Sequence, residues 1–234
     1  MFREVQQICS AGFYFLLSLI CLCSAAHADV GVYAEGAYTD TNLVVYIYAD
    51  ISGSTELRSA GVKLTYSSAE LSIASAEKNE ADWFLGTQAY MDPQISTPGQ
   101  VVIILGKIDT ADLSAGVSGE RVLLGKVIFN RTGSSTDFGL GLDYGKRGVG
   151  GSYKNFVDTA NPATVLDDVA VGFGSLTVVE RGDANADGSI DISDVSEIRK
   201  MVFNEIPKTC YADCNADGDV NISDVTCIRD KVFQ

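Results

Sequence analysis

Apolar and polar residues alternate along most of residues 29–180, which is the pattern of strands that bury one face. Turns rich in Gly, Ser, Asn and Asp separate the alternating segments, and no long segment repeats at helical period. The pattern predicts a mainly β domain, an all-β sandwich. The residues expected on the buried faces are Leu43, Val45, Ile47, Val62, Leu64, Tyr66, Val101, Ile103, Leu105, Val127, Phe129, Phe138, Leu140, Leu142, Leu176 and Val178.

The pattern changes at residue 181, where an internal repeat begins. Asp183 opens DANADGSIDISDVSEIRKMVF, and Asp213, 30 residues later, opens DCNADGDVNISDVTCIRDKVF. Apolar residues recur in each copy at the spacing i, i+3, i+7, which predicts a short helix with one apolar stripe. These residues are Val195, Ile198 and Val202 in the first copy, and Val225, Ile228 and Val232 in the second. We expect the two helices to bury their stripes against each other.

Each copy begins with the D-x-N-x-D-G pattern of an EF-hand-type calcium loop. Oxygen ligands at alternating positions suit a hard cation that takes six to eight of them, and glycine at position 6 makes the sharp bend. Two matched copies argue against acidic turns that bind nothing, so we expect two calcium ions. The candidate ligands are Asp183, Asn185, Asp187, Ser189 (carbonyl), Asp191 (through water), Asp194, Asp213, Asn215, Asp217, Asp219 (carbonyl), Asn221 and Asp224.

Two such loops, each ending in Asp at position 12 and each followed by one helix, resemble a type I dockerin domain over residues 181–234. The resemblance implies calcium-dependent docking to a cohesin module, in extracellular complexes that break down polysaccharides. It also implies that loop positions 10 and 11 help to select the cohesin. The two copies agree at these positions and at an arginine further along, which would permit docking in two orientations. The implied partner-binding residues are Ile192, Ser193, Arg199, Ile222, Ser223 and Arg229.

Within residues 29–180, the segments 43–79 and 119–129 are similar to strands of a cohesin domain. The resemblance implies a nine-stranded jelly-roll sandwich, a frame that some carbohydrate-binding modules share, so three roles stay open. The domain is a cohesin-like module that accepts a dockerin, including one from another copy; or it binds polysaccharide; or it is a spacer that carries the tail. Exposed aromatic residues would mark the sugar-binding role, and the candidates are Trp83, Phe84, Tyr90, Tyr144 and Tyr153.

An apolar run from Ala11 to Cys23 follows Arg3 and leads to the small-residue sequence Ala26-His27-Ala28. This arrangement predicts a signal peptide over residues 1–28 and a secreted, extracellular mature chain; an uncleaved anchor is the alternative. The run is shorter than the ~20 residues of a membrane-spanning helix. We therefore expect no membrane span after cleavage.

Charge and composition narrow the possible functions. The net charge is −14, and the sequence has no basic segment of the kind that neutralises phosphates. We therefore do not expect the chain to bind nucleic acid. The single histidine lies in the predicted signal peptide, which excludes His-dependent triads and His-ligated zinc from the mature chain. Paired carboxylates could serve a glycosidase, but they are more typical of solvated turns, so we predict no enzyme. The carboxylates considered are Asp109, Asp112, Asp143, Asp167 and Asp168.

Three cysteines, Cys210, Cys214 and Cys227, remain after cleavage. In an oxidising compartment they predict one disulfide and one thiol. We favour Cys210–Cys227, because a residue at the start of a loop–helix unit often packs on the helix that ends it, although the sequence leaves the pairing open. The joint at residues 178–182 has no proline-rich tether, so the domains 29–180 and 181–234 are expected to lie close together.

Overall fold

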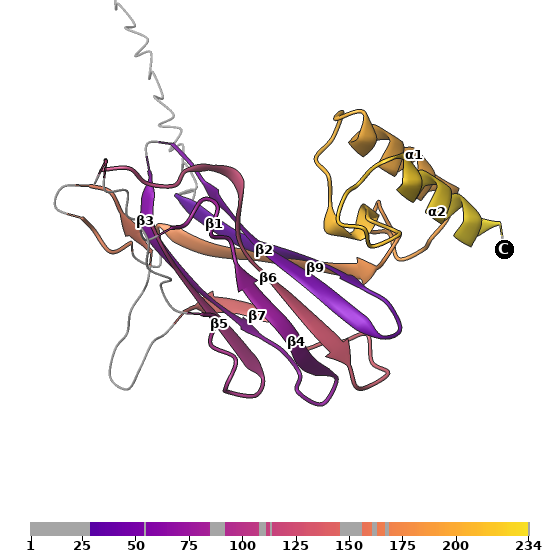
Figure 1. The fold of residues 1–234 in the computed structure, drawn as a ribbon, viewed down its shortest axis with the longest axis horizontal. Helices are drawn as coiled ribbons and strands as arrows, with labels where there is room; N and C mark the ends of the chain where they lie inside the picture. The colour runs from indigo at the N-terminus through magenta and orange to yellow at the C-terminus, as the bar shows by residue number, and fades with distance from the viewer. Residues whose placement is uncertain are drawn as a thin grey trace, which may run out of the picture.

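The computed structural model describes residues 29–53, 55–84, 92–107, 111–112, 114–145, 156–160, 163–166 and 169–233. Two β-sheets pack face to face, and a small helical tail follows them (Figure 1). The predicted signal peptide lies outside the described residues, as do Tyr90, Tyr153, Asp109, Asp167 and Asp168.

The first sheet has five strands in the order β4–β6–β2–β1–β9. Neighbouring strands are antiparallel except β1 and β9, which run parallel. The bounds are β1 Val30–Tyr38, β2 Asn42–Ile51, β4 Leu71–Lys78, β6 Gly119–Arg131 and β9 Val171–Glu180.

The second sheet has the order β5–β3–β7, and a short β8 also pairs with β3. Its strands are β3 Leu57–Thr65, β5 Gln100–Gly106, β7 Gly141–Tyr144 and β8 Val157–Asp158. The described pairings in this sheet are all antiparallel.

The core lies between the two sheets. Leu43, Val45 and Ile47 are fully buried on one face of β2, and Phe129 of β6 packs with them. The sixteen residues predicted to face the core all belong to this cluster or pack against it. The sequence pattern did not predict β1, because its small residues Ala34, Gly36 and Ala37 weaken the alternation.

The tail begins where β9 ends. Its helices are α1 (Ile192–Val202) and α2 (Ile222–Val232), and a short 3-10 helix, η1 (Cys210–Ala212), lies between them. Ile198 and Ile228 are fully buried in a small second core, so the predicted helix pair is confirmed. The predicted fold class, a β-sandwich followed by a small helical domain, is confirmed. Among the described residues, neither helix has the length and apolar character needed to cross a membrane.

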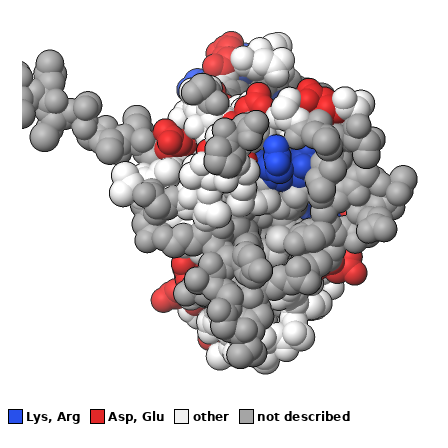
Figure 2. Space-filling model, turned by 90° about the vertical axis from the view of Figure 1, so that its left-hand side faces the viewer, with Lys and Arg blue, Asp and Glu red and all other residues white. Residues whose placement is uncertain are grey.

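Figure 2 shows one side of the molecule, on which acidic side chains lie at several places around the rim; basic side chains form one small patch near the centre, and a few more lie near the top. A broad basic surface of the kind that covers nucleic-acid phosphates is absent from the described residues on this side.

Candidate functional site: the duplicated acidic loops and their junction with the sandwich

The two loops share an unusual backbone. Gly188 and Gly218, at position 6 of each loop, have φ values of +91° and +96°, which only glycine adopts at little cost. Ala186 and Ala216, two residues earlier, are also left-handed, with φ of +57° and +61°. The same conformation in both copies shows that the repeat in sequence is a repeat in geometry.

The first aspartate of each loop organises the turn. The carboxylate of Asp183 accepts hydrogen bonds from the backbone N–H of Asp187 (3.1 Å) and Gly188 (2.9 Å). Asp213 accepts the equivalent bonds from Asp217 (3.2 Å) and Gly218 (3.1 Å). The loop therefore wraps around the side chain at position 1.

The last aspartate of each loop is fully buried and joins the loop to its helix. Asp194 accepts from the backbone N–H of Ala184 (2.7 Å) and Asp191 (2.8 Å), and Asp191 in turn caps the N–H of Ser193. Asp224 and Asn221 form the same capping box at α2. Burial raises the pKa of Asp194 and Asp224 above the ordinary carboxyl value, since an ionised carboxylate loses water there.

The donor set fits a hard cation. Carboxylate, amide and carbonyl oxygens alternate along each loop, and the loops contain no sulfur or imidazole ligand at the alternating positions. Within the described residues, however, no three His, Cys, Asp or Glu side chains are gathered into a metal-binding cluster. The carboxylates instead accept backbone N–H groups, so the assignment of calcium ligands stays a proposal.

The candidate docking residues lie on the solvent side of the helices. Ile192 is 58% exposed and Ile222 is 65% exposed, although both are large apolar side chains. Ser193, Ser223, Arg199 and Arg229 are exposed as well. In each copy the Ile and Ser lie at the start of the helix, and the Arg lies in its last turn.

Sequence reasoning missed two further exposed apolar residues of the tail. Phe203 and Phe233 end the two helices, and both are strongly exposed. The signal was present, because each repeat ends in the same phenylalanine. The copies also differ in charge at one exposed position, where α1 has Lys200, which pairs with Glu197, and α2 has Asp230, which pairs with Arg229.

The cysteine pairing differs from the favoured prediction. The disulfide joins Cys214 and Cys227, whose Cα atoms are 6.0 Å apart, and Cys210 is the free thiol. Cys210–Cys227 was wrong because Cys210, at the start of η1, lines the cleft that faces the sandwich, whereas Ala212 at the end of η1 packs in the helical core. Cys214, at loop position 2, faces the helix that follows its own loop.

One arginine of the sandwich connects it to the tail. Arg121 has φ of +54° at an irregularity between β2 and β6, and its backbone N–H donates to Asp50 (2.7 Å). Its guanidinium donates to both carboxylate oxygens of Glu35 and lies 4.3 Å from the ring centroid of Tyr48. It also donates to the carbonyl oxygen of Lys208 at 2.8 Å. A β-bulge changes the direction of a side chain, which explains how Arg121 can reach both Glu35 and the tail.

A second arginine holds the other side of the junction. Arg181, directly after β9, donates to the carbonyl oxygen of Asp213 at 2.8 Å and lies 3.6 Å from its carboxylate. Lys231 of α2 donates to the carbonyl oxygen of Arg181 at 2.7 Å. The second loop is therefore tied to the linker, and the predicted close packing of the two domains agrees with these contacts.

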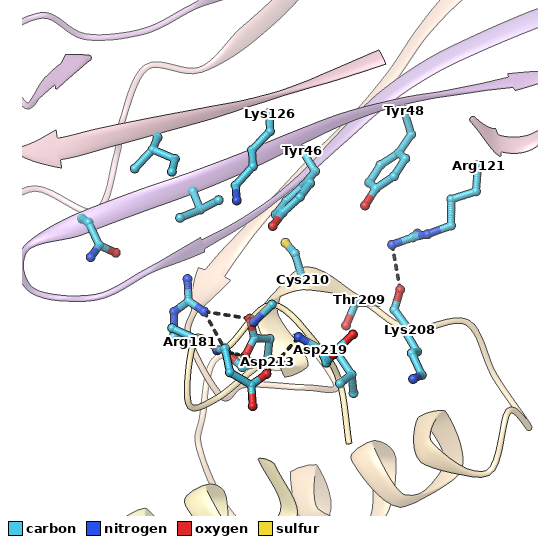
Figure 3. A pocket seen from close by; sticks show the side chains of 17 residues that line it. Tyr46, Tyr48, Arg121, Lys126, Arg181, Lys208, Thr209, Cys210, Asp213 and Asp219 are labelled. Carbon is cyan, nitrogen blue, oxygen red and sulfur yellow. Dashed lines mark hydrogen bonds and ion pairs between the residues drawn. The ribbon is translucent and has the colours of Figure 1, made fainter. Parts of the chain in front are cut away.

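A cleft of about 490 Å³ lies between the first sheet and the second loop (Figure 3). Tyr46, Tyr48 and Lys126 point into it from the sandwich. Arg181, Cys210 and Asp219 are among the residues of the opposite wall. Burial raises the pKa of the Cys210 thiol to about 12 and raises the pKa of Tyr48, so both stay protonated at neutral pH.

The aromatic residues proposed for sugar stacking are mostly unavailable. Trp83 is only 2% exposed and belongs to the core. Tyr144 packs edge-on against Phe173, with ring centroids 4.9 Å apart. Phe84 is 37% exposed and has Lys107 5.8 Å from its ring centroid. The described part of the sandwich thus offers no exposed row of these candidates, since Phe84 stands alone among them.

The described carboxylates that were considered for catalysis have structural roles. Asp143 forms an ion pair with Lys63 at 2.7 Å. Asp112 lies in an exposed turn and accepts from the hydroxyl of Ser114 at 2.6 Å. Those bonds lower the pKa of Asp112, which keeps it ionised and unsuited to acid catalysis.

Comparison with known proteins gives a family for the tail. Residues 181–232 match the family model of the dockerin type I domain, which confirms the resemblance seen in the repeat. No curated protein sequence matches the chain significantly.

Solved structures that are similar to this chain include cohesin modules, alone or in complex with a dockerin. They include CaCohA2 from Clostridium acetobutylicum, with 13% identity, TM-score 0.46, and coverage of 68% of this chain and 94% of that one. The seventh ScaB type I cohesin from Pseudobacteroides cellulosolvens has 16% identity and TM-score 0.40, covering 66% and 94%. A non-cellulosomal cohesin from the archaeon Archaeoglobus fulgidus has 16% identity and TM-score 0.36, covering 68% and 96%. With scores this low, these likenesses carry no argument about function.

Proposed function

We propose that this chain is a secreted, non-catalytic assembly protein whose tail binds two calcium ions and docks to a cohesin module. The observation that carries the proposal is the pair of matched loops whose helices expose the same apolar residue, Ile192 in one copy and Ile222 in the other. The match of residues 181–232 to the dockerin type I model supports this partner. The implied setting is an extracellular complex that degrades polysaccharides.

The residues of each loop would hold calcium by a common arrangement. In the first loop, Asp183, Asn185 and Asp187 supply side-chain oxygens, Ser189 supplies its carbonyl, and Asp194 closes the site. Calcium supplies positive charge that offsets the clustered carboxylates. Asp194 and Asp224 lie in the first turn of their helices and are buried without a cation partner among the described residues. Cation binding would therefore stabilise loop and helix together.

Docking would then use the outer faces of the helices. Removal of an exposed Ile and Phe from water supplies the apolar part of binding, and Ser193 or Ser223 with Arg199 or Arg229 supplies hydrogen bonds at the edge. Because both copies expose the same set, either copy can face the partner. The capping boxes fix the start of each helix, which places the docking residues relative to the loops.

The test is binding of the mature chain to a panel of immobilised type I cohesin modules, measured by biolayer interferometry in calcium and in chelator. We expect saturable binding to at least one cohesin in calcium and loss of that binding in chelator. Phe84→Ala, on the sandwich, is the control and should bind unchanged. Absence of binding to every type I cohesin in calcium would contradict the proposal.

The partner can also be another copy of this chain, if the sandwich is itself cohesin-like. Size-exclusion chromatography with light scattering separates the two cases. A calcium-dependent oligomer that Ile192→Asp/Ile222→Asp returns to monomer supports self-assembly, and a monomer in both conditions assigns the tail to a foreign cohesin. The alternative function, polysaccharide binding through exposed aromatic residues, loses its main candidate because Trp83 is buried.

A further inference from the structure

Arg181 lies two residues before the first loop in the sequence, yet its side chain contacts the second loop. Its guanidinium donates to the carbonyl oxygen of Asp213 at 2.8 Å and lies 3.6 Å from the carboxylate of that residue (Figure 3). Asp213 is also the only described residue with which this side chain forms a hydrogen bond or an ion pair. The link between the two domains therefore places a positive charge at position 1 of the second loop.

The position of Arg181 is fixed by its surroundings. Its side chain is only 9% exposed. Its backbone N–H donates to the carbonyl oxygen of Tyr38 in β1 at 2.8 Å, and its own carbonyl oxygen accepts from Lys231 of α2 at 2.7 Å. Because the side chain is buried and the backbone is held from both sides, the charge stays beside Asp213 when a cation enters the loop.

The first loop has no such cation beside it. Asp183, at position 1 of this loop, is 1% exposed, and no described lysine or arginine forms an ion pair with it. The other charged residue that lines the small cavity at Asp183 is Glu180, a carboxylate. Each loop contains four aspartates within its twelve positions, so the loops do not differ in their own charge. The electrostatic difference between the two sites comes from the residues that flank them.

We infer that Arg181 lowers the calcium affinity of the second loop, so that the first loop fills before the second. An ion bound to the paired oxygen of Asp213 would lie within about 6 Å of the guanidinium, since a calcium–oxygen bond is about 2.4 Å long. Even in the dielectric of bulk water, one positive charge at this distance weakens the binding of a divalent ion about tenfold. Salt screens only part of this effect, because the distance is shorter than the Debye length.

The disulfide is the other difference between the two copies, and it brings no charge to the second site. Cys214 and Cys227 correspond to Ala184 and Glu197 in the first copy. The bond is present in every variant of Arg181, so a comparison among such variants isolates the effect of the charge. The inference rests on the proposed binding of calcium by both loops. It implies that the copy with Ile222 at loop position 10 is completed at a higher calcium concentration than the first copy.

The experiment is a calcium titration of the isotope-labelled mature chain, followed by nuclear magnetic resonance. Gly188 and Gly218 donate their N–H groups to the aspartates at position 1, so their signals report the two loops separately. We expect the Gly188 signal to complete its change at a lower calcium concentration than the Gly218 signal. Arg181→Gln removes the charge and keeps a side-chain donor. It should raise the calcium affinity of the second loop at least about threefold relative to that of the first.

Two further variants separate the charge from the shape of the side chain. Arg181→Lys keeps the positive charge and should preserve the order of filling. Lys200→Gln removes an equal charge from the exposed side of α1 and should leave both affinities unchanged. The inference is overturned if folded Arg181→Gln leaves the ratio of the two affinities unchanged.

The titration of the parent chain needs no substitution, so it tests the order of filling even if a variant does not fold. A second loop that fills first, or together with the first loop, would overturn the inference and leave the proposed function standing. If neither glycine signal responds to calcium, the proposed function is rejected as well.

Discussion

The guanidinium of Arg121 in β6 donates a hydrogen bond of 2.8 Å to the carbonyl oxygen of Lys208, 87 residues later in the tail. The same guanidinium donates to Glu35 and lies over the ring of Tyr48. Contacts within the sandwich therefore fix its position independently of the tail. The tail is thus supported by a contact that fixes its loops near the first sheet and leaves both helices facing solvent (Figure 1).

The first prediction concerns this junction. Arg121→Met leaves the buried carboxylate of Glu35 without its partner and should lower the free energy of unfolding by about 2 kcal/mol. Arg229→Met removes an exposed arginine that pairs with Asp230 and should cost less than about 0.5 kcal/mol. Urea denaturation of both variants measures the difference. Glu35→Gln added to Arg121→Met should recover part of the loss, and a strictly additive double variant would contradict the pairing.

The second prediction concerns the cysteines. Cys227→Ser removes the disulfide with Cys214, which closes a loop of 13 residues, and should destabilise the tail by about 3 kcal/mol. Cys210→Ser should leave the disulfide intact and the stability of the tail nearly unchanged. Peptide mapping without reduction identifies the bond directly. A linked peptide pair containing Cys210 would refute the observed pairing.

The third prediction concerns the duplicated docking surface. Ile192→Asp or Ile222→Asp alone should weaken cohesin binding by only about twofold, because one orientation remains. The double variant should bind the cohesin with an affinity at least about a hundredfold lower, since both apolar contacts are replaced by charges. Surface plasmon resonance against a cohesin that binds the parent chain measures both effects. If either single variant abolishes binding, the tail has one docking orientation.

The fourth prediction follows from the raised pKa of Asp194 and Asp224. A carboxyl whose pKa rises on folding contributes stability at low pH, and this contribution is lost as pH rises through the folded pKa. In chelator, the melting temperature of the helices should therefore fall as the pH rises above the ordinary carboxyl range. In calcium it should rise over the same range, because protons compete with the ion.

The control for this pH effect is Asp194→Asn/Asp224→Asn. Asp191 and Asp217 have lowered pKa values, from hydrogen bonds with Ser193 and Asp219 respectively, and they act in the opposite direction. The double variant keeps those two groups and removes the buried pair. If the melting temperature of this double variant depends on pH in chelator as it does in the parent chain, Asp194 and Asp224 are not the cause of the pH dependence.

Local pattern was sufficient to predict much of the fold. Alternation placed Leu43, Val45 and Ile47 on the buried face of one strand, because side chains of a strand alternate between two faces. The repeat likewise predicted both helices and their buried residues Ile198 and Ile228. These features depend on residues that are close together in the chain, so they can be predicted from local sequence patterns.

Contacts between distant segments could not be predicted in this way. Nothing near Arg121 in the sequence indicates that Lys208 would accept its hydrogen bond. Trp83 was a candidate for sugar stacking because buried and exposed aromatic residues look alike in a sequence. The cysteine pairing depended on which face of η1 meets the sandwich, and that is a property of the packed domains.

The most direct test of the account is calcium titration of the mature chain by isothermal titration calorimetry. The account predicts two calcium ions per chain, one ion for Asp183→Ala or Asp213→Ala, and none for the double variant, because each aspartate organises one loop. The helical circular dichroism should fall when calcium is chelated. A chain that binds no calcium, or that binds two ions in spite of both substitutions, would contradict the central claim.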